Sequence, residues 1–207
     1  MPRVSTRHPD RAEEPSIGRP RSEAARHAVL NAVDDMLVEH GYAALTMKGI
    51  AERAGVGRQT VYRWWSTKAE ILFEACAQDA ATELAVRPTA DPVADITNYL
   101  VAVATFLTRS TAGAGYRALL GEAQHDPDVA DLLRGKDVLT TSARLVIDRA
   151  VEGADRTTSA SVDELIADLV GPVLFPILTG AGTPTRAELR TRARRFLENA
   201  HRDGAAD

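Results

Sequence analysis

One stretch of the chain decides the fold: Ala51-Glu52-Arg53-Ala54-Gly55-Val56-Gly57, with Thr60-Val61-Tyr62 following shortly after it. A helix-turn-helix needs a small residue where its two helices cross, a glycine in the turn and an apolar side chain just after that glycine. Ala51, Gly55 and Val56 supply these features in that order. The stretch therefore predicts a helix-turn-helix, with a plain helical hairpin as the alternative interpretation.

The second helix of this motif would begin at Arg58 and carry Gln59 and Thr60 in its first turn. In helix-turn-helix proteins this end of the second helix enters the major groove of DNA. Arginine can bond O6 and N7 of guanine, and glutamine can bond N6 and N7 of adenine. These residue types indicate a surface that can discriminate between bases.

Helical signals surround the motif. Apolar residues at helical spacing precede Gly41, which is a suitable stop, and Thr46 and either Ser66 or Thr67 are suitable N-caps. The expected helices in this part of the chain cover residues 22–40, 47–54, 58–64 and 68–84.

The remaining sequence also predicts helices. Asp91-Pro92 and Asp126-Pro127 are start signals that combine a cap with a proline, and Ser161 to Glu164 form a capping box. The expected helices cover residues 92–107, 115–124, 127–152, 161–178 and 186–202. Because no strand-like alternation competes with them, the expected fold class is all-α.

The composition is typical of a soluble globular protein, with 207 residues, 44% hydrophobic and 26% charged. No run approaches the ~18 apolar residues of a membrane span, and the N-terminus lacks the apolar core of a secretory signal. We therefore expect a cytoplasmic protein without a membrane partner. The single cysteine, Cys76, excludes an intramolecular disulfide and a multi-cysteine zinc site, and we expect no metal and no cofactor.

The charge is unevenly distributed along the chain. The net charge is −4, but residues 44–68 carry five basic side chains and one acidic one, a local charge of +4. Residues 71–184 carry 8 basic and 16 acidic side chains, a charge of −8. Exposed charges further apart than ~8–10 Å are largely screened, so the basic segment can still bind phosphate.

The N-terminal segment closely resembles the DNA-binding domain of the TetR family of transcriptional repressors. The resemblance is carried, in order, by His40-Gly41-Tyr42, Leu45-Thr46, Ile50 to Val56, Thr60 to Trp65 and Lys68 to Leu72. It implies a three-helix DNA-binding domain and an all-helical regulatory and dimerisation domain, whose last two helices form a homodimeric four-helix bundle. The expected divisions are an arm over residues 1–21, a DNA-binding domain over 22–68 and a body over 69–207.

The resemblance also implies which residues contact DNA. Arg58 and Gln59 become the base-reading candidates, and Lys48 is a further candidate for a base edge or a phosphate. The phosphate candidates are Thr46, Thr60, Tyr62, Trp64 and Lys68. Trp64 departs from the family's commoner His or Tyr, although its indole N–H can donate to phosphate, whereas Trp65 is expected in the core.

The arm adds Arg19 and Arg21, in the segment Gly18-Arg19-Pro20-Arg21. A flexible basic arm can enter the minor groove beside the recognition site. A solvated tail that contacts nothing is the alternative, and the sequence favours neither.

Enzymatic function is not expected. The chain has no G-x-S-x-G elbow, P-loop, dinucleotide fingerprint or H-E-x-x-H motif, and its five histidines are scattered. A DNA-binding architectural protein without an effector is a second alternative, but the large helical body favours regulation by a small molecule. The candidates for an apolar pocket with a few polar anchors in the body are Tyr99, Phe106, Tyr116, Gln124, His125 and Phe175, and for each of them taken singly a plain core position is the favoured alternative.

The last two helices supply the expected dimer contacts. Their apolar residues at helical spacing are Leu165, Leu169, Val173, Ile177, Leu189, Ala193 and Phe196. Pro172 and Pro176 are expected to bend the first of these helices. Together these features predict a homodimeric, ligand-responsive repressor that binds a palindromic DNA operator. The effector and the operator sequence are not encoded in any motif of the chain.

Overall fold

The computed structural model describes residues 18–150 and 161–202, and within them all regular secondary structure is helical. The elements are α1 (Gly18–His40), the short 3-10 helix η1 (Tyr42–Ala44), α2 (Met47–Arg53), α3 (Arg58–Tyr62), α4 (Lys68–Glu83), α5 (Pro92–Arg109), α6 (Thr111–Glu122), α7 (Pro127–Lys136), α8 (Val138–Ala150), α9 (Val162–Leu178) and α10 (Arg186–Arg202). The predicted all-α fold is confirmed. No helix in the described part of the chain is long and apolar enough to cross a membrane.

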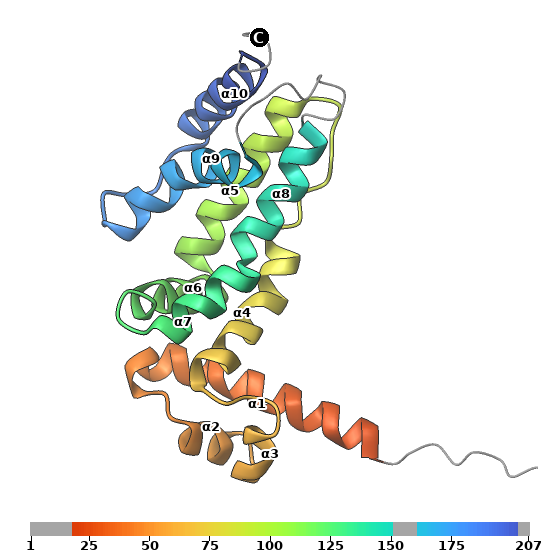
Figure 1. Ribbon diagram of the computed structural model, residues 1–207, viewed down its shortest axis with the longest axis vertical. Coiled ribbons are helices and arrows are strands. Elements are labelled where there is room, and N and C mark those ends of the chain that lie inside the picture. The colour runs from red at the N-terminus through yellow and green to blue at the C-terminus, as the bar shows by residue number, and fades with distance from the viewer. Residues whose placement is uncertain (1–17, 151–160, 203–207) are drawn as a thin grey trace, which may run out of the picture.

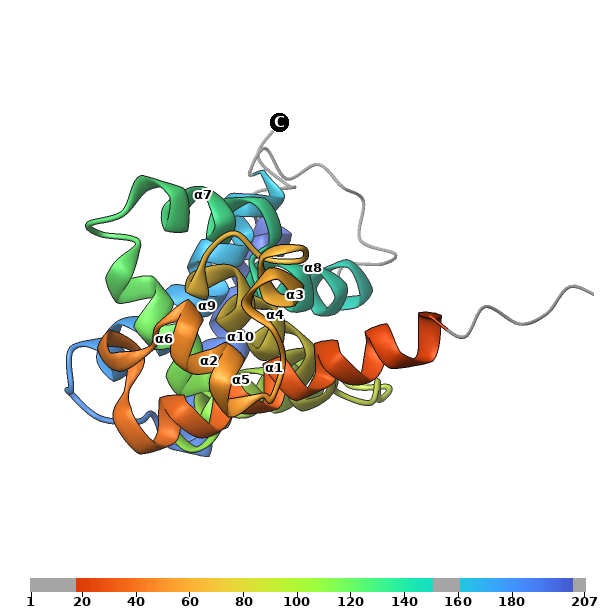
Figure 2. The ribbon, with the colours of Figure 1, turned by 90° about the horizontal axis from the view of Figure 1, so that it is seen from below.

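The molecule is elongated, with α2 and α3 at one end and α10 at the other (Figure 1). We call α1 to α3 the head and α5 to α10 the body. α4 leads from the head into the body and packs against α1, α6 and α8. Seen from below, the N-terminal part of α1 extends beyond the body (Figure 2).

The helix starts follow the caps expected from the sequence. Thr46 Oγ1 accepts the N–H of Gly49 at 3.0 Å, and Thr67 rather than Ser66 caps α4. Asp91 and Asp126 cap helices that begin with proline, and Ser161 and Glu164 form a complete capping box. These local hydrogen bonds satisfy N–H groups that have no partner within a helix.

Two helices begin earlier than expected. α1 starts at Gly18, so the last four residues of the predicted arm are helical, while residues 1–17 lie outside the described part. Pro20 is tolerated there because the first N–H groups of a helix have no partner to lose. α6 starts at Thr111 instead of 115, because Ser110 Oγ accepts the N–H of Gly113 and so caps the helix.

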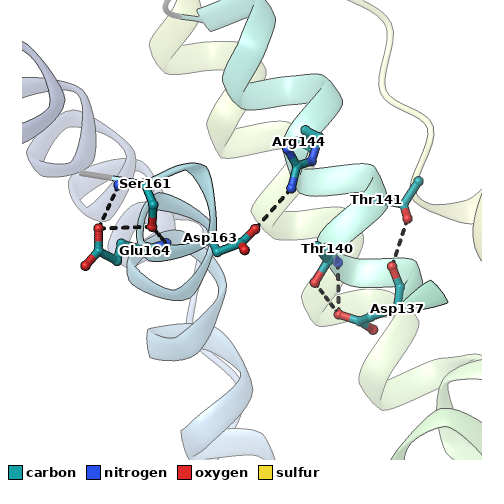
Figure 3. Close-up of polar contacts among 7 residues, drawn as sticks. All are labelled: Asp137, Thr140, Thr141, Arg144, Ser161, Asp163 and Glu164. Carbon is teal, nitrogen blue, oxygen red and sulfur yellow. Dashed lines mark hydrogen bonds and ion pairs between the residues drawn. The ribbon is translucent and has the colours of Figure 1, made fainter. Parts of the chain in front are cut away.

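The predicted uninterrupted helix over residues 127–152 is wrong, because the chain breaks at Asp137 between α7 and α8. The Asp137 carboxylate accepts two hydrogen bonds from Thr140, one from its backbone N–H at 3.0 Å and one from its side-chain hydroxyl at 2.6 Å (Figure 3). It also accepts the Tyr116 hydroxyl at 2.5 Å. An aspartate that bonds nearby backbone in this way competes with helix continuation. The apolar period does not reveal such a break, because it continues across it.

Two glycines allow α6 to lie close to its neighbours. A Cβ at Gly115 would lie 2.7 Å from the Cys76 sulfur and 2.9 Å from a methyl carbon of Leu72 on α4. A Cβ at Gly113 would lie 1.8 Å from the backbone oxygen of Phe106 at the end of α5. Cys76 is completely buried in this contact, as a small apolar residue would be.

The body is built around α5, which packs against α6, α8, α9 and α10. Tyr99, Leu100, Val103 and Phe106 of α5 are completely buried. At the surface, Arg144 of α8 forms an ion pair with Asp163 of α9 at 3.0 Å (Figure 3). α9 continues through Pro172 and Pro176. The core of the body therefore surrounds α5, and the other helices cover it.

Replacing Gly113 tests the close approach of α5 and α6. We expect Gly113→Ala to lower the free energy of unfolding by about 1–3 kcal/mol or more, because its methyl group would collide with backbone. Gly121→Ala is the control, since nothing lies within 4 Å of a Cβ there and alanine favours the helix. Urea unfolding followed by circular dichroism measures both. Equal stabilities of the two variants would contradict the close contact.

Candidate nucleic-acid interface

α3 is anchored on one face and exposed on the other. Val61 is completely buried between the head helices. Arg58, Gln59 and Tyr62 are exposed, with 55% of Tyr62 accessible to solvent, and Thr60 is half-buried. Gly55, at φ 68°, makes the turn that brings α3 across α2. The predicted base-reading pair therefore lies on the solvent-facing side of a firmly packed helix.

A hydrogen bond between Trp65, which follows α3, and Glu74 of α4 holds these two helices together. Trp65 is buried, and its indole N–H donates to the Glu74 carboxylate at 3.0 Å. Glu74 also forms an ion pair with Arg26 of α1 at 2.8 Å. The core position expected for Trp65 is confirmed, and its contacts connect α1, α4 and the end of α3.

α2 is tied to α1 by charge. The two terminal guanidinium nitrogens of Arg53 donate to the Glu39 carboxylate, Nη2 at 2.6 Å and Nη1 at 2.9 Å. Nη2 also contacts Asp35 at 3.3 Å. The hydrogen bond from Arg53 holds the pKa of Glu39 below its usual value. Arg53 contributes to the basic count of residues 44–68, but in the structure its charge is used to orient α2.

Other basic and hydroxyl groups of the head have internal partners too. Lys48 lies 3.7 Å from Glu52 in an exposed ion pair. Lys68 Nζ donates to the Tyr42 carbonyl at 3.2 Å and sits 4.2 Å from the centre of its ring. Burial, with Glu122 and Asp126 nearby, raises the pKa of Tyr42 to about 12. Thr46 Oγ1 serves as a cap, and its hydroxyl proton is still free to donate to a phosphate.

Trp64 is half-buried and packs edge-on against Trp65, with ring centroids 5.4 Å apart. For Arg19 and Arg21 the structure describes only a helical backbone, in the first turn of α1. Arg63, which the sequence analysis did not single out, is exposed at the end of α3. Its position four residues after Gln59, on the same face of a helix, was the signal that could have found it.

Comparison with known proteins identifies this arrangement. The family described as "Bacterial regulatory proteins, tetR family" matches residues 29–75, and the family described as "Tetracyclin repressor-like, C-terminal domain" matches residues 86–204. The chain belongs to the TetR family of transcriptional regulators. It is thus a helix-turn-helix DNA-binding protein and not an enzyme, as the sequence predicted.

Relatives support the same family over most of the chain. YdeS of Bacillus subtilis (strain 168), an uncharacterized HTH-type transcriptional regulator, is 31% identical over 163 residues, which cover 78% of this chain and 82% of that protein. The DNA-binding transcriptional repressor TetR of Mycobacteroides abscessus is 30% identical over 118 residues, covering 55% and 60%. The crystal structure of the TetR family transcription regulator SCO0332 has a TM-score of 0.70 at 28% identity, covering 84% of this chain and 97% of that one.

The structure brings part of the predicted effector-pocket set of this TetR-family protein together, since the ring centroids of Phe106 and Tyr116 lie 6.1 Å apart, but Gln124, His125 and Phe175 lie outside this core. Tyr99, Phe106 and Tyr116 are buried in the core of the body, where the Tyr99 hydroxyl lies 3.1 Å from the Leu139 carbonyl oxygen and 3.0 Å from Ser142 Oγ. His125 is exposed between α6 and α7, and 70% of Phe175 on α9 is accessible to solvent. Gln124 lies beside His125, outside the core.

Two cavities do occur beside these helices, and most of the residues that line them differ from the predicted pocket residues. A groove of about 570 Å³ lies between α4 and α8 and is lined mostly by apolar side chains, among them Ala81, Leu84, Val138 and Leu145. A second cavity of about 690 Å³ lies between α6, α7, α8 and α9, and Tyr116 is the one predicted pocket residue in its lining. Lys136, Thr141 and Leu145 line both cavities, which therefore meet at the start of α8.

The predicted dimer residues are mostly covered within the single chain. Six are buried and Leu165 is half-buried; the buried ones are Leu169, Val173, Ile177, Leu189, Ala193 and Phe196. They pack where α9 and α10 meet α5. Their part in a dimer stays a prediction. On the opposite face of α9, Phe175 and Leu178 are exposed.

Arg58→Ala tests the reading of bases by α3. We expect a loss of about 1–3 kcal/mol in binding free energy, with relaxed preference at one base position per half-site, because a bidentate base contact is removed. The measurement is a mobility-shift assay on a duplex selected from a random library and on its single-base variants. Equal losses on every duplex would show that Arg58 contacts phosphate instead.

Proposed function

We propose that this TetR-family protein is a homodimeric repressor that binds a near-palindromic operator and is released from it by a small molecule bound in the body. The observation that carries the proposal is that α4 borders the apolar groove at one end and follows α3 directly at the other. The Mycobacteroides abscessus relative is named a transcriptional repressor, and this name supports repression rather than activation.

On this proposal the two copies present their α3 helices to successive major grooves, which are ~34–36 Å apart along the duplex. Residues 22–68 would form the DNA-binding domain and residues 69–207 the regulatory and dimerisation domain. Arg58 and Gln59 would contact bases, and Lys48 would contact a base edge or a phosphate. The phosphate contacts would come from Thr46, Thr60, Tyr62 and Lys68. A dimer binds such a site because its two-fold axis matches the palindrome.

The α4–α8 groove is the effector site that the structure supports best. It is concave and mostly apolar, and Thr141 and Ser142 offer polar groups to orient a ligand. A ligand between α4 and α8 favours conformations in which these helices are further apart. Movement of α4 changes the position of Trp65 and Glu74, and so the spacing of the two α3 helices. The mechanism is a population shift toward a state that does not fit DNA.

Filling the groove tests this assignment. We expect Ala81→Trp to weaken binding of the apolar dye anilinonaphthalene sulfonate and to abolish release by any compound that releases the wild type, because the indole occupies the groove. DNA affinity without compound should stay nearly unchanged. The control is Thr82→Trp, on the neighbouring exposed position of α4 that does not line the groove.

Fluorescence anisotropy of a labelled operator, titrated with a library of apolar compounds, gives the readout. Linkage requires that operator weaken compound binding by the same factor, with a coupling of typically ~1–3 kcal/mol. If compounds bind in the groove and none changes DNA affinity, the protein is an effector-independent DNA-binding protein. If Ala81→Trp is released as readily as the wild type, the effector binds elsewhere.

The dimer surface is proposed on the exposed face of α9. Phe175 is 70% and Leu178 47% accessible in the single chain, and the half-buried Pro172 lies on the same side. A second copy would remove this apolar area from water, which favours association. The groove between α9 and α10, lined by Pro172, Arg192 and Arg195, continues this surface.

Phe175→Glu tests the dimer surface. We expect it to shift the protein toward monomer, because association would bury an unpaired charge, while the fold stays intact since the residue is exposed. Leu145→Glu, at an exposed apolar residue of α8, is the control and should stay dimeric. Sedimentation velocity over a range of micromolar concentrations measures both. A dimeric Phe175→Glu variant would place the contact on another face.

A further inference from the structure

Arg63 directly follows the last residue of α3 and lies close to the base-reading candidates. Its N–H bonds the Gln59 carbonyl at 3.1 Å, so its side chain lies on the same helix face as that of Gln59. The residue is exposed, and its guanidinium carbon lies 4.8 Å from the centre of the Trp64 ring. Within the described part of the chain it forms no ion pair.

The ring under this guanidinium is itself held in place. Trp64 is half-buried and meets Trp65 edge-on, at an interplanar angle of 73°. Trp65 in turn is fixed by its hydrogen bond to Glu74. A guanidinium stacked on a fixed ring loses little further conformational entropy on binding, and its N–H groups remain free at the edge of the plane.

We propose that Arg63 binds a DNA backbone phosphate and that Trp64 acts as a positioning residue, holding the guanidinium at the end of α3. The charge around α3 supports this, because Arg53, the remaining arginine beside Arg58 and Arg63, is paired with Glu39 and Asp35. Among the arginines of residues 44–68, Arg58 and Arg63 are therefore the two that form no ion pair in the described structure. A planar guanidinium also matches phosphate geometry better than an ammonium does.

The positioning role differs from a direct contact by Trp64. If the indole N–H of Trp64 donated to phosphate itself, Trp64 would contribute to DNA binding whether or not Arg63 were present. If Trp64 acts through Arg63, its contribution disappears once Arg63 is removed. A double-mutant cycle separates the two cases.

The experiment measures binding of the full chain to a labelled random-sequence duplex over a series of salt concentrations, so it needs neither the operator nor the effector. We expect Arg63→Ala to reduce the slope of log K against log salt by about 0.9 for each phosphate that Arg63 neutralises, and affinity at low salt to fall several-fold. Arg63→Lys should keep the slope. The control is Arg87→Ala, which removes the same charge at a position after α4, away from the head, and which should change neither quantity.

Trp64→Leu and Trp64→Phe complete the cycle, and the thermal unfolding midpoint checks that each variant is folded. We expect Trp64→Leu to weaken binding in the wild type and to have no effect in the Arg63→Ala background, with Trp64→Phe restoring part of the affinity. An Arg63→Ala variant that matches Arg87→Ala in slope and affinity overturns the phosphate assignment. Equal weakening by Trp64→Leu in both backgrounds overturns the positioning role and indicates a direct contact by the indole.

Discussion

The hydrogen bond from the Trp65 indole to Glu74 is the interaction on which the geometry of the head depends. It joins the segment that follows α3 to the second turn of α4, and Glu74 extends the connection to Arg26 on α1. A five-residue helix such as α3 is not stable alone, so its orientation must come from packing. Buried Val61 and Trp65 supply that packing, and the hydrogen bond to the partly buried Glu74 carboxylate fixes the orientation of the Trp65 ring. α3 therefore moves with α4, which is what a regulator needs if events in the body are to reach DNA.

The location of the charged side chains in this protein matters more for DNA binding than the net charge of the chain does. The whole chain is acidic, and even the basic segment over residues 44–68 uses part of its charge internally, in the ion pair of Arg53 with Glu39. Exposed ion pairs contribute little to stability in general, so the value of the Arg53 contact lies in orienting α2. What remains exposed around α3 is a small number of cations on one face. DNA binding by this protein should accordingly be short-range and strongly dependent on salt.

Local chemistry made much of the fold predictable. Caps such as Thr46 and Ser161, and the glycine turn at Gly55, are set by hydrogen bonds within a few residues, so the sequence alone reveals them. The break at Asp137 also involves local bonds to Thr140, but the apolar period continues across it and so favoured one long helix. The further bond from Tyr116 forms only in the folded chain. The same distinction explains the site. Arg58 and Gln59 follow from a motif, whereas the apolar groove between α4 and α8 and the exposed face of α9 are products of packing between distant helices.

The contact between α1 and α4 contains an electrostatic cost at Asp34. One carboxylate oxygen of Asp34 is buried without a hydrogen-bond partner in the described residues, and burial together with Asp79 and Asp35 raises its pKa to about 6. An acid whose pKa is raised by folding destabilises the folded state at pH values above the raised pKa, and the cost decreases as pH falls from the raised pKa toward the ordinary pKa of the acid. At neutral pH the contact therefore carries an ionised group that would be better solvated if α1 and α4 moved apart.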